Sequence, residues 1–239
     1  MRGQLALAVE QSERVRRGGL KAPAGDAPAR RVVAAFDFDG TITDRDTLVP
    51  FLVRAFGRAR VLAVFALLAL PAVAVLVRLR TIDEFKVRVL RRLVAGARVD
   101  RLVAVAATHA VELGVWLRPQ ALQRIHWHRR QGHLLVLVSS TLDLYLAPVT
   151  ERLGFDHVLC SRLDARWDTA GVHRFTGELA GADCTGPEKL RRLQALVGDL
   201  ADIELHAYGD SEGDRALLAV ADHAHFRPFR RVGSGAVTR

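Results

Sequence analysis

The sequence predicts an α/β fold in which a doubly wound parallel sheet carries an inserted helical cap. Three apolar runs support the sheet, at residues 32–36, 134–138 and 203–208, and each is followed by polar residues or glycine. Uninterrupted apolar runs of this length are typical of strands buried on both faces of a parallel sheet. Residues 47–120, between the first two runs, are mostly helical in pattern and predict the cap. Ligands bind at the carboxyl ends of the strands in such sheets, so we expect the polar ends to meet in one site.

Size and composition are those of a folded intracellular protein. Of the 239 residues, 50% are hydrophobic and 26% are charged, which is enough for a buried core and excludes global disorder. Cys160 and Cys184 are far apart and lack metal-ligand spacing, which argues against a disulfide scaffold or a zinc ribbon. Residues 1–30 are basic, lack the apolar segment of a secretory signal, and predict a mobile tail.

The positive charge of the chain does not identify a partner. The formal net charge is +9, but only three of the 35 basic residues are lysine (Lys21, Lys86 and Lys189), so arginine is used throughout the chain. Aromatic residues make up 6% and are scattered, whereas nucleic-acid surfaces interleave basic and aromatic residues on one face. A basic nucleic-acid-binding protein, or a degenerate binding protein, remains the non-enzyme alternative.

The first apolar run ends in Asp37-Phe38-Asp39-Gly40-Thr41, the most informative stretch of the chain. Gly40 permits a sharp turn, so both carboxylates can approach one ligand. Such a stretch also occurs in surface turns and calcium loops, and it does not define the chemistry alone.

The insertion contains an unusual apolar segment. Residues 61–77 carry no charge, contain Pro71, and are bounded by Arg60 and Arg78. A single membrane crossing would place Asp37 and Ser139 on opposite sides of the bilayer, and two crossings need more residues than this. One interpretation is a pair of short apolar cap helices, packed on each other or on a second copy of the chain. The alternative is an apolar hairpin that dips into the membrane surface between arginines.

Polar groups follow the later elements. Ser139 ends the second run and offers a hydroxyl donor, and Gly186-Pro187 predicts the start of a helix that carries Lys189. Residues 163–179 have the pattern of a β-hairpin.

The histidines do not predict a transition-metal site. His126, His128 and His133 have no matched carboxylate or cysteine nearby, while His223 and His225 alternate as in a strand.

The third run ends in Gly209-Asp210-Ser211-Glu212-Gly213-Asp214. Its acids are too few and wrongly spaced for an EF-hand. Together with Asp37 and Asp39 they form an oxygen-rich set that suits Mg²⁺, and without a cation these carboxylates would repel one another. The sequence therefore predicts a magnesium site.

These motifs, in this order, resemble those of the haloacid dehalogenase (HAD) superfamily. The helical insertion after the first motif and the approach to Lys189 resemble the phosphoserine-phosphatase-like subclass, subfamily IB. The resemblance covers residues 31–228 and implies a HAD-like Rossmannoid core. Asp39 also favours a phosphatase, because the dehalogenase and ion-pump branches of the family carry no acid there.

The resemblance implies a role for each acid. Asp37 is the nucleophile that becomes an aspartyl-phosphate, and Asp39 protonates the leaving oxygen and later activates water. Mg²⁺ is held by the side chains of Asp37 and Asp210 and the backbone carbonyl of Asp39. Asp214 orders that shell from behind.

The resemblance also implies the groups that bind phosphate and substrate. Thr41, Ser139 and Lys189 are expected to bind the phosphate oxygens. Asp46 lies nine positions after Asp37, where phosphoserine phosphatases carry a glutamate that contacts the substrate amine. The chain continues after Ser139 without the glycines of those enzymes, which argues against strict phosphoserine specificity. The apolar segment at 61–77 resembles that of bacterial phosphatidylglycerophosphatases, so a membrane-surface lipid phosphatase is the alternative.

We therefore expect a Mg²⁺-dependent phosphomonoester hydrolase. Residues 31–46 and 119–228 are expected to form the core, residues 47–118 the helical cap, and residues 1–30 and 229–239 the tails. The expected substrate is a small phosphorylated metabolite or a lipid phosphate. We expect a cytoplasmic enzyme. In the lipid-phosphatase alternative, residues 61–77 hold it at the inner face of the membrane. Both the metabolite and the lipid alternative are compatible with an oligomer.

Overall fold

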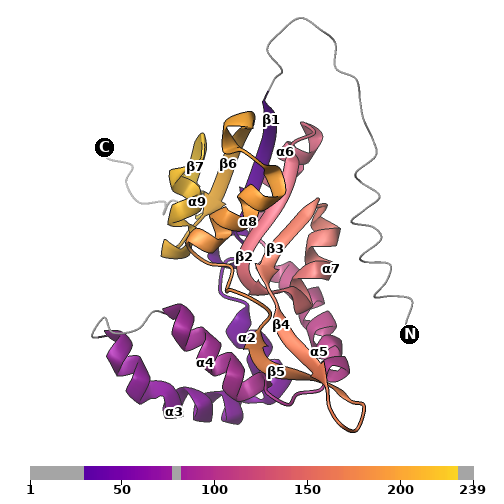
Figure 1. Ribbon diagram of the computed structural model, residues 1–239. Coiled ribbons are helices and arrows are strands. Elements are labelled where there is room, and N and C mark those ends of the chain that lie inside the picture. The colour runs from indigo at the N-terminus through magenta and orange to yellow at the C-terminus, as the bar shows by residue number, and fades with distance from the viewer. Residues whose placement is uncertain (1–29, 77–81, 231–239) are drawn as a thin grey trace, which may run out of the picture.

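The computed structural model, which describes residues 30–76 and 82–230, contains a five-stranded parallel sheet (Figure 1). The strand order is β3-β2-β1-β6-β7, and all neighbours are parallel. The bounds are Arg31–Phe36 for β1, Leu134–Leu142 for β2, His157–Ser161 for β3, Ile203–Gly209 for β6 and His223–Phe226 for β7. The three predicted strands are adjacent, so their carboxyl ends share one edge. The prediction of an α/β parallel sheet is confirmed.

The sheet is buried on both faces, which explains the apolar runs. In β1, Ala34 and Phe36 pack into a core shared with α6, α7 and the inserted helices. Val33 and Ala35 point the other way, into a core shared with α8 and α9. The flanking helices are α6 (Pro119–Arg130), α7 (Asp143–Leu153), α8 (Pro187–Val197) and α9 (Arg215–Ala219).

Among the described residues, four α-helices make up most of the insertion between β1 and α6. They are α2 (Leu48–Phe56), α3 (Arg58–Leu76), α4 (Ile82–Val94) and α5 (Val99–Glu112), and Figure 1 shows α2, α3 and α4 beyond one end of the sheet. The chain leaves and returns at one place, where Thr43 bridges Leu117 and the Arg118 amide donates to the Ile42 carbonyl oxygen at 2.8 Å. The division into a core of residues 31–46 and 119–228 and a cap of residues 47–118 is kept as a proposal. Most of the predicted tails lies outside the described residues.

The predicted hairpin is present and contacts the cap. Strands β4 (Leu163–Trp167) and β5 (His173–Leu179) pair antiparallel, and β5 packs on α4. A Cβ at Gly177 would lie 2.9 Å from the Ala95 Cβ, so glycine permits the close approach of hairpin and helix.

The expectation that the charge-free segment forms two short helices or a hairpin is wrong. Residues 61–76 belong to one helix, α3, which continues through Pro71. Proline inside a helix costs about 3 kcal/mol, but its neighbours here are mostly alanine and leucine, which favour helix strongly. Residue 77 lies outside the described residues. None of the described helices is both long enough and apolar enough to cross a membrane.

Strand β2 is longer than expected. It continues through Ser139 and Ser140 to Leu142, so the prediction that it ends at these two serines is wrong. The reason is its partner strand: Ser139 pairs with Cys160, and after an irregularity Leu142 pairs with Ser161.

Candidate active site

The turn after β1 brings the first two carboxylates to the edge of the sheet. The Asp37 amide donates to the Tyr208 carbonyl oxygen at 2.9 Å, which extends the pairing of β1 with β6 by one residue. Gly40 has φ +75°, and a Cβ there would lie 2.5 Å from Asp210 Oδ2. Glycine is therefore needed both for the turn and for the contact with Asp210.

A buried lysine joins the motifs. Pro187 and Gly186 begin α8 as predicted, and Lys189 in its first turn is 2% exposed. Its Nζ lies 2.7 Å from Asp37 Oδ1 and 2.5 Å from Asp214 Oδ1. Side chains from the turn after β1, from α8 and from the segment after β6 therefore meet at one point.

Asp214 is fixed as an ionised group behind this lysine. Its Oδ2 accepts hydrogen bonds from the Asp210 amide, the Ser211 amide and the Ser211 hydroxyl at 2.8–3.0 Å. Burial alone would raise its pKa, but Lys189 and the hydrogen bonds outweigh burial and hold the pKa below its ordinary value.

The two carboxylates of the first motif titrate near neutrality. Burial raises the pKa of Asp37 to about 6, although Lys189 opposes the rise. Burial, together with the charge of Asp46, raises the pKa of Asp39 to about 7 against hydrogen bonds from Thr141 and Thr47. A carboxyl group with a pKa near 7 is suited to both donate and accept a proton.

Two threonines orient Asp39. Its Oδ1 accepts from the Thr47 amide at 3.0 Å and the Thr47 hydroxyl at 2.7 Å, and its Oδ2 accepts from the Thr141 hydroxyl. The Ser139 hydroxyl donates to Thr141 Oγ1 at 3.0 Å, so Ser139 is connected to Asp39 through Thr141.

Thr41 carries an unsatisfied hydroxyl. It is 1% exposed, and its Oγ1 has no hydrogen-bond partner among the described residues. A buried polar group without a partner costs about 1–3 kcal/mol, so this hydroxyl is suited to a ligand oxygen.

Asp46 has a structural role in the described chain. Its Oδ1 accepts from the Leu48 and Val49 amides at 3.0 and 3.1 Å, and it caps the start of α2. Its contact with substrate stays a prediction.

Sequence reasoning missed Thr47, Thr141 and Lys86. The Lys86 Nζ, on α4, lies 2.8 Å from Asp183 Oδ1 and contacts the Ser140 carbonyl oxygen, so the cap is tied to β2 beside the site. The rarity of lysine in the chain is a signal that could have identified Lys86. Thr141 belonged to the polar run after Ser139, whereas no sequence signal marked Thr47.

The carboxylates fit a divalent cation. One oxygen from each of Asp37, Asp210 and Asp214 lies within 4.8 Å of the others. Asp210 also contacts the exposed Arg230 guanidinium, with Asp210 Oδ2 and Arg230 Nη2 2.9 Å apart. Hard oxygen donors of this kind suit Mg²⁺, whereas a softer metal would favour nitrogen or sulfur. These residues could hold the metal that the sequence predicts.

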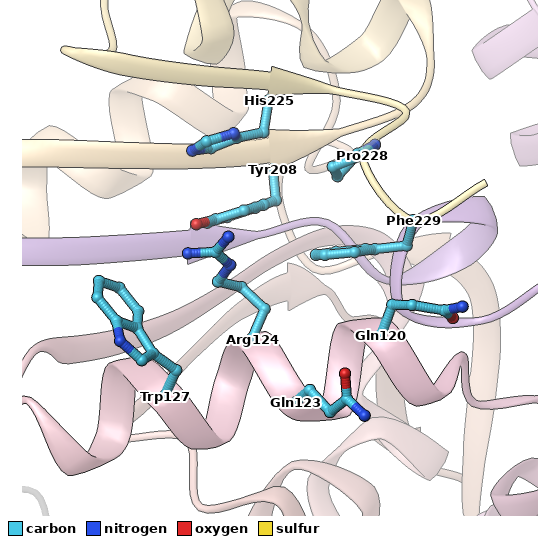
Figure 2. A pocket seen from close by; sticks show the side chains of 8 residues that line it. All are labelled: Gln120, Gln123, Arg124, Trp127, Tyr208, His225, Pro228 and Phe229. Carbon is cyan, nitrogen blue, oxygen red and sulfur yellow. The ribbon is translucent and has the colours of Figure 1, made fainter. Parts of the chain in front are cut away.

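A separate cavity of about 650 Å³ lies between α6 and the strands β6 and β7 (Figure 2). Its lining is aromatic and polar and consists of Gln120, Gln123, Arg124, Trp127, Tyr208, His225, Pro228 and Phe229. None of the predicted site residues lines it.

Comparisons with known proteins agree with this architecture. The chain is 34% identical over 211 residues to Protein CicA of Caulobacter vibrioides. The aligned region covers 86% of this chain and 90% of that protein. A Bordetella pertussis protein of unknown function has 24% identity and a TM-score of 0.63, over 80% of this chain and 87% of that one. A phosphoserine phosphatase with a phospho-aspartyl intermediate analogue has 17% identity and a TM-score of 0.54, over 81% and 84%.

The family comparison covers the core and the insertion together. The profile of the haloacid dehalogenase-like hydrolases matches residues 34–219, which include all the acids described above. The structural likeness to phosphoserine phosphatase shows a shared fold. The chain therefore belongs to the haloacid dehalogenase-like hydrolase family, as its motifs predicted.

Proposed function

We propose that the protein is a Mg²⁺-dependent phosphatase that hydrolyses a phosphomonoester through an aspartyl-phosphate on Asp37. The observation that carries the proposal is the buried Lys189 ammonium between Asp37 and Asp214. A carboxylate nucleophile must be ionised, and the lysine favours that form in a site where burial opposes it. The same positive charge would attract the phosphate group of a substrate.

In the first step, an Asp37 carboxylate oxygen attacks phosphorus and the bond from phosphorus to the ester oxygen breaks. The leaving oxygen takes the proton of Asp39, whose carboxyl is held by Thr47 and Thr141. The pKa of about 7 for Asp39 means that a large fraction of the protein carries this proton at neutral pH.

In the second step, the Asp39 carboxylate takes a proton from water, and the resulting hydroxide attacks the phosphorus of the aspartyl-phosphate. The bond between phosphorus and the Asp37 oxygen breaks, inorganic phosphate leaves, and both acids return to their starting states. One hard displacement is thus divided into two easier ones.

The remaining site residues bind and neutralise charge. Asp37 and Asp210 would hold Mg²⁺ with the backbone carbonyl of Asp39, and Asp214 would order them. When bound, the metal neutralises charge on the phosphate oxygens and on the carboxylates. The unpartnered Thr41 hydroxyl would donate to a phosphate oxygen, and the Ser139 hydroxyl would do so after turning away from Thr141 Oγ1.

The family and the fold support a phosphatase without defining its substrate. One structural neighbour is a phosphoserine phosphatase that carries a phospho-aspartyl intermediate analogue. In this chain Asp46 accepts hydrogen bonds at the start of α2, and Lys86 on α4 pairs with Asp183. The inserted segment therefore contributes charged groups to its side of the site. We propose a phosphomonoester as the substrate class.

Replacing the nucleophile tests this proposal. Asp37→Asn should lower kcat for a phosphomonoester by about 10⁴-fold or more, because an amide cannot form the phosphoryl intermediate. Asp44→Asn, at an exposed aspartate of the same segment, is the matched control and should keep near wild-type activity. Substantial turnover by a folded Asp37→Asn protein would remove Asp37 from the mechanism.

Metal removal tests the carboxylate site. Chelator-treated protein should lose activity and regain it with added Mg²⁺, and Asp210→Asn should need far more Mg²⁺ for half-maximal activity. Glu212→Gln, at an exposed acid of the same loop, should respond like the wild type. Full activity in protein shown to be free of divalent metal would contradict the proposal.

Replacing the lysine tests the electrostatics. In Mg²⁺-free buffer at pH 7, Lys189→Met should lower the free energy of unfolding by about 3–5 kcal/mol, since it leaves two buried carboxylates unpaired. The loss should shrink as the pH falls towards 5. Unpaired buried carboxyls have a raised pKa in the folded state, so that state takes up more protons and gains stability as pH falls.

Urea unfolding at both pH values measures this effect. Arg191→Met, which removes an exposed ion pair with Glu188 on the same helix, should change stability little at either pH. Equal stability of Lys189→Met and wild type would show that the ammonium does not hold the acids together.

A lipid phosphate is the second candidate substrate, favoured by the surface of α3. Leu62 and Leu67 are 62% and 58% exposed, and Arg58 and Arg60 lie in the first turn of the same helix. A helix this apolar is normally buried, so an apolar partner is needed for its outer side. We propose that this surface, with Leu62 and Leu67 at its centre, rests on anionic lipid.

Vesicle flotation tests the lipid candidate. Wild-type protein should float with phosphatidylglycerol vesicles, and Leu62→Glu/Leu67→Glu should not, while its turnover of a soluble phosphomonoester is unchanged. Val111→Glu, at a 67% exposed position on α5, is the control and should float. Wild-type protein that stays with the unbound fraction would exclude this candidate.

A further inference from the structure

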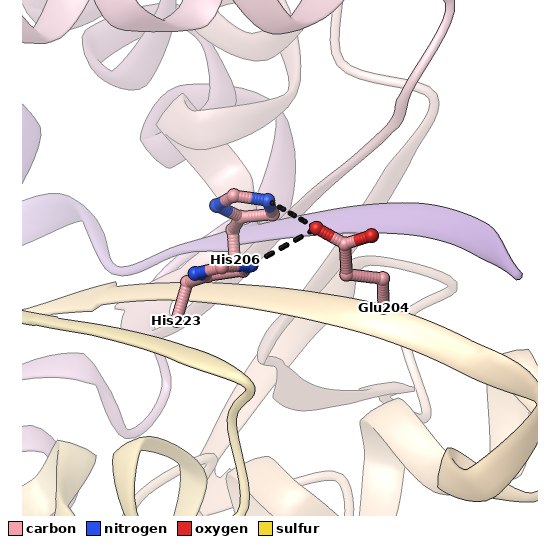
Figure 3. A group of neighbouring side chains, drawn as sticks. All are labelled: Glu204, His206 and His223. Carbon is pink, nitrogen blue, oxygen red and sulfur yellow. Dashed lines mark hydrogen bonds and ion pairs between the residues drawn. The ribbon is translucent and has the colours of Figure 1, made fainter.

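A second group of metal-ligand side chains lies away from the carboxylate site. Glu204 and His206 are two residues apart on β6, so they point to the same face of the sheet. His223, on the edge strand β7, pairs in register with His206. Figure 3 shows the three side chains converging above these two strands.

The distances match those around a single ion. Glu204 Oε1 lies 2.9 Å from His223 Nε2 and 3.4 Å from His206 Nε2, and the three ligand atoms lie within 4.8 Å of one another. Ligands about 2.0–2.1 Å from a tetrahedral zinc ion lie about 3.3 Å apart. The two imidazole rings are stacked with centroids 4.2 Å apart, which aims both Nε2 atoms at the same carboxylate.

The two histidines share one carboxylate oxygen. His206 Nε2 and His223 Nε2 both face Glu204 Oε1, so a cation placed between them could take all three atoms as ligands. His206 Nδ1 is shielded from solvent and has no hydrogen-bond partner within residues 30–76 and 82–230. No hydrogen bond from that nitrogen within the described residues therefore competes with the orientation of the ring toward Glu204.

We propose that Glu204, His206 and His223 bind a divalent transition-metal ion of the zinc class, which fastens the edge strand β7 to β6. Two imidazole nitrogens and one carboxylate oxygen suit such an ion, whereas Mg²⁺ prefers oxygen ligands alone. Glu204 lies five residues before Gly209, where β6 ends, roughly 16 Å along the strand. The site is therefore separate from the carboxylates at the other end of β6. Sequence analysis weighed His126, His128 and His133 as a transition-metal site, and it assigned His223 and His225 to a strand.

The test measures zinc binding in full-length protein without a histidine tag. Asp210→Asn is introduced first to weaken the carboxylate site. Equilibrium dialysis of chelator-treated protein should then find about one Zn²⁺ per chain. Adding His223→Asn should weaken this binding by at least about 100-fold. Adding His173→Asn instead, at a histidine stacked on Trp167 in the β-hairpin, should leave it unchanged.

A second variant and a second readout guard against misfolding. Glu204→Gln in the same background should also lose Zn²⁺, and Zn²⁺ should raise Tm only in proteins that keep the site. His223→Asn alone should keep wild-type Mg²⁺-dependent phosphatase activity, which separates this test from that of the proposed function. Absence of bound Zn²⁺ in Asp210→Asn, or its retention after His223→Asn, would overturn the proposal and leave only a hydrogen bond between His223 and Glu204.

Discussion

The Lys189 ammonium, buried between the carboxylates of Asp37 and Asp214, is the interaction on which the rest of the site depends. Two carboxylates this close repel each other, and moving each ion out of water costs several kcal/mol. The lysine offsets both costs at once. Because its partners come from the turn after β1 and from the segment after β6, both ion pairs form only when α8 packs against the completed sheet. Assembly of the core and assembly of the site are therefore one event.

The parallel sheet supplies the geometry that this interaction requires. With β1 between β2 and β6, the turn after one strand lies beside the ends of both neighbours. Gly40 allows that turn to touch Asp210, and Thr47 brings the start of the insertion onto Asp39. The insertion is thus attached to Asp39, the proposed proton-transfer group, as well as to the surface of the core. Movement of the insertion would change the Thr47 hydrogen bonds, which lower the pKa of Asp39 against the effect of burial.

The sequence predicted most of the strands and turns, and fewer of the contacts between segments that are distant in the chain. Apolar runs buried on both faces identify parallel strands, and a glycine after paired acids identifies the turn. The single helix α3 was not predicted, because Pro71 disfavours a helix while its neighbours favour one. Only the sum of these preferences decides whether the helix continues through Pro71. Thr47 and the group formed by Glu204, His206 and His223 depend on contacts between separate segments, which no local pattern encodes. Their roles became visible only once register and strand order were known.

Chemical trapping of the intermediate tests the central claim most directly. Protein mixed with substrate and Mg²⁺ is quenched in acid during turnover and treated with borohydride, which reduces an aspartyl-phosphate to homoserine. Peptide mass spectrometry then locates the reduced residue. The account predicts homoserine at position 37, formed only when substrate is present. Steady turnover with no reduced residue, or reduction at a different aspartate, would contradict it.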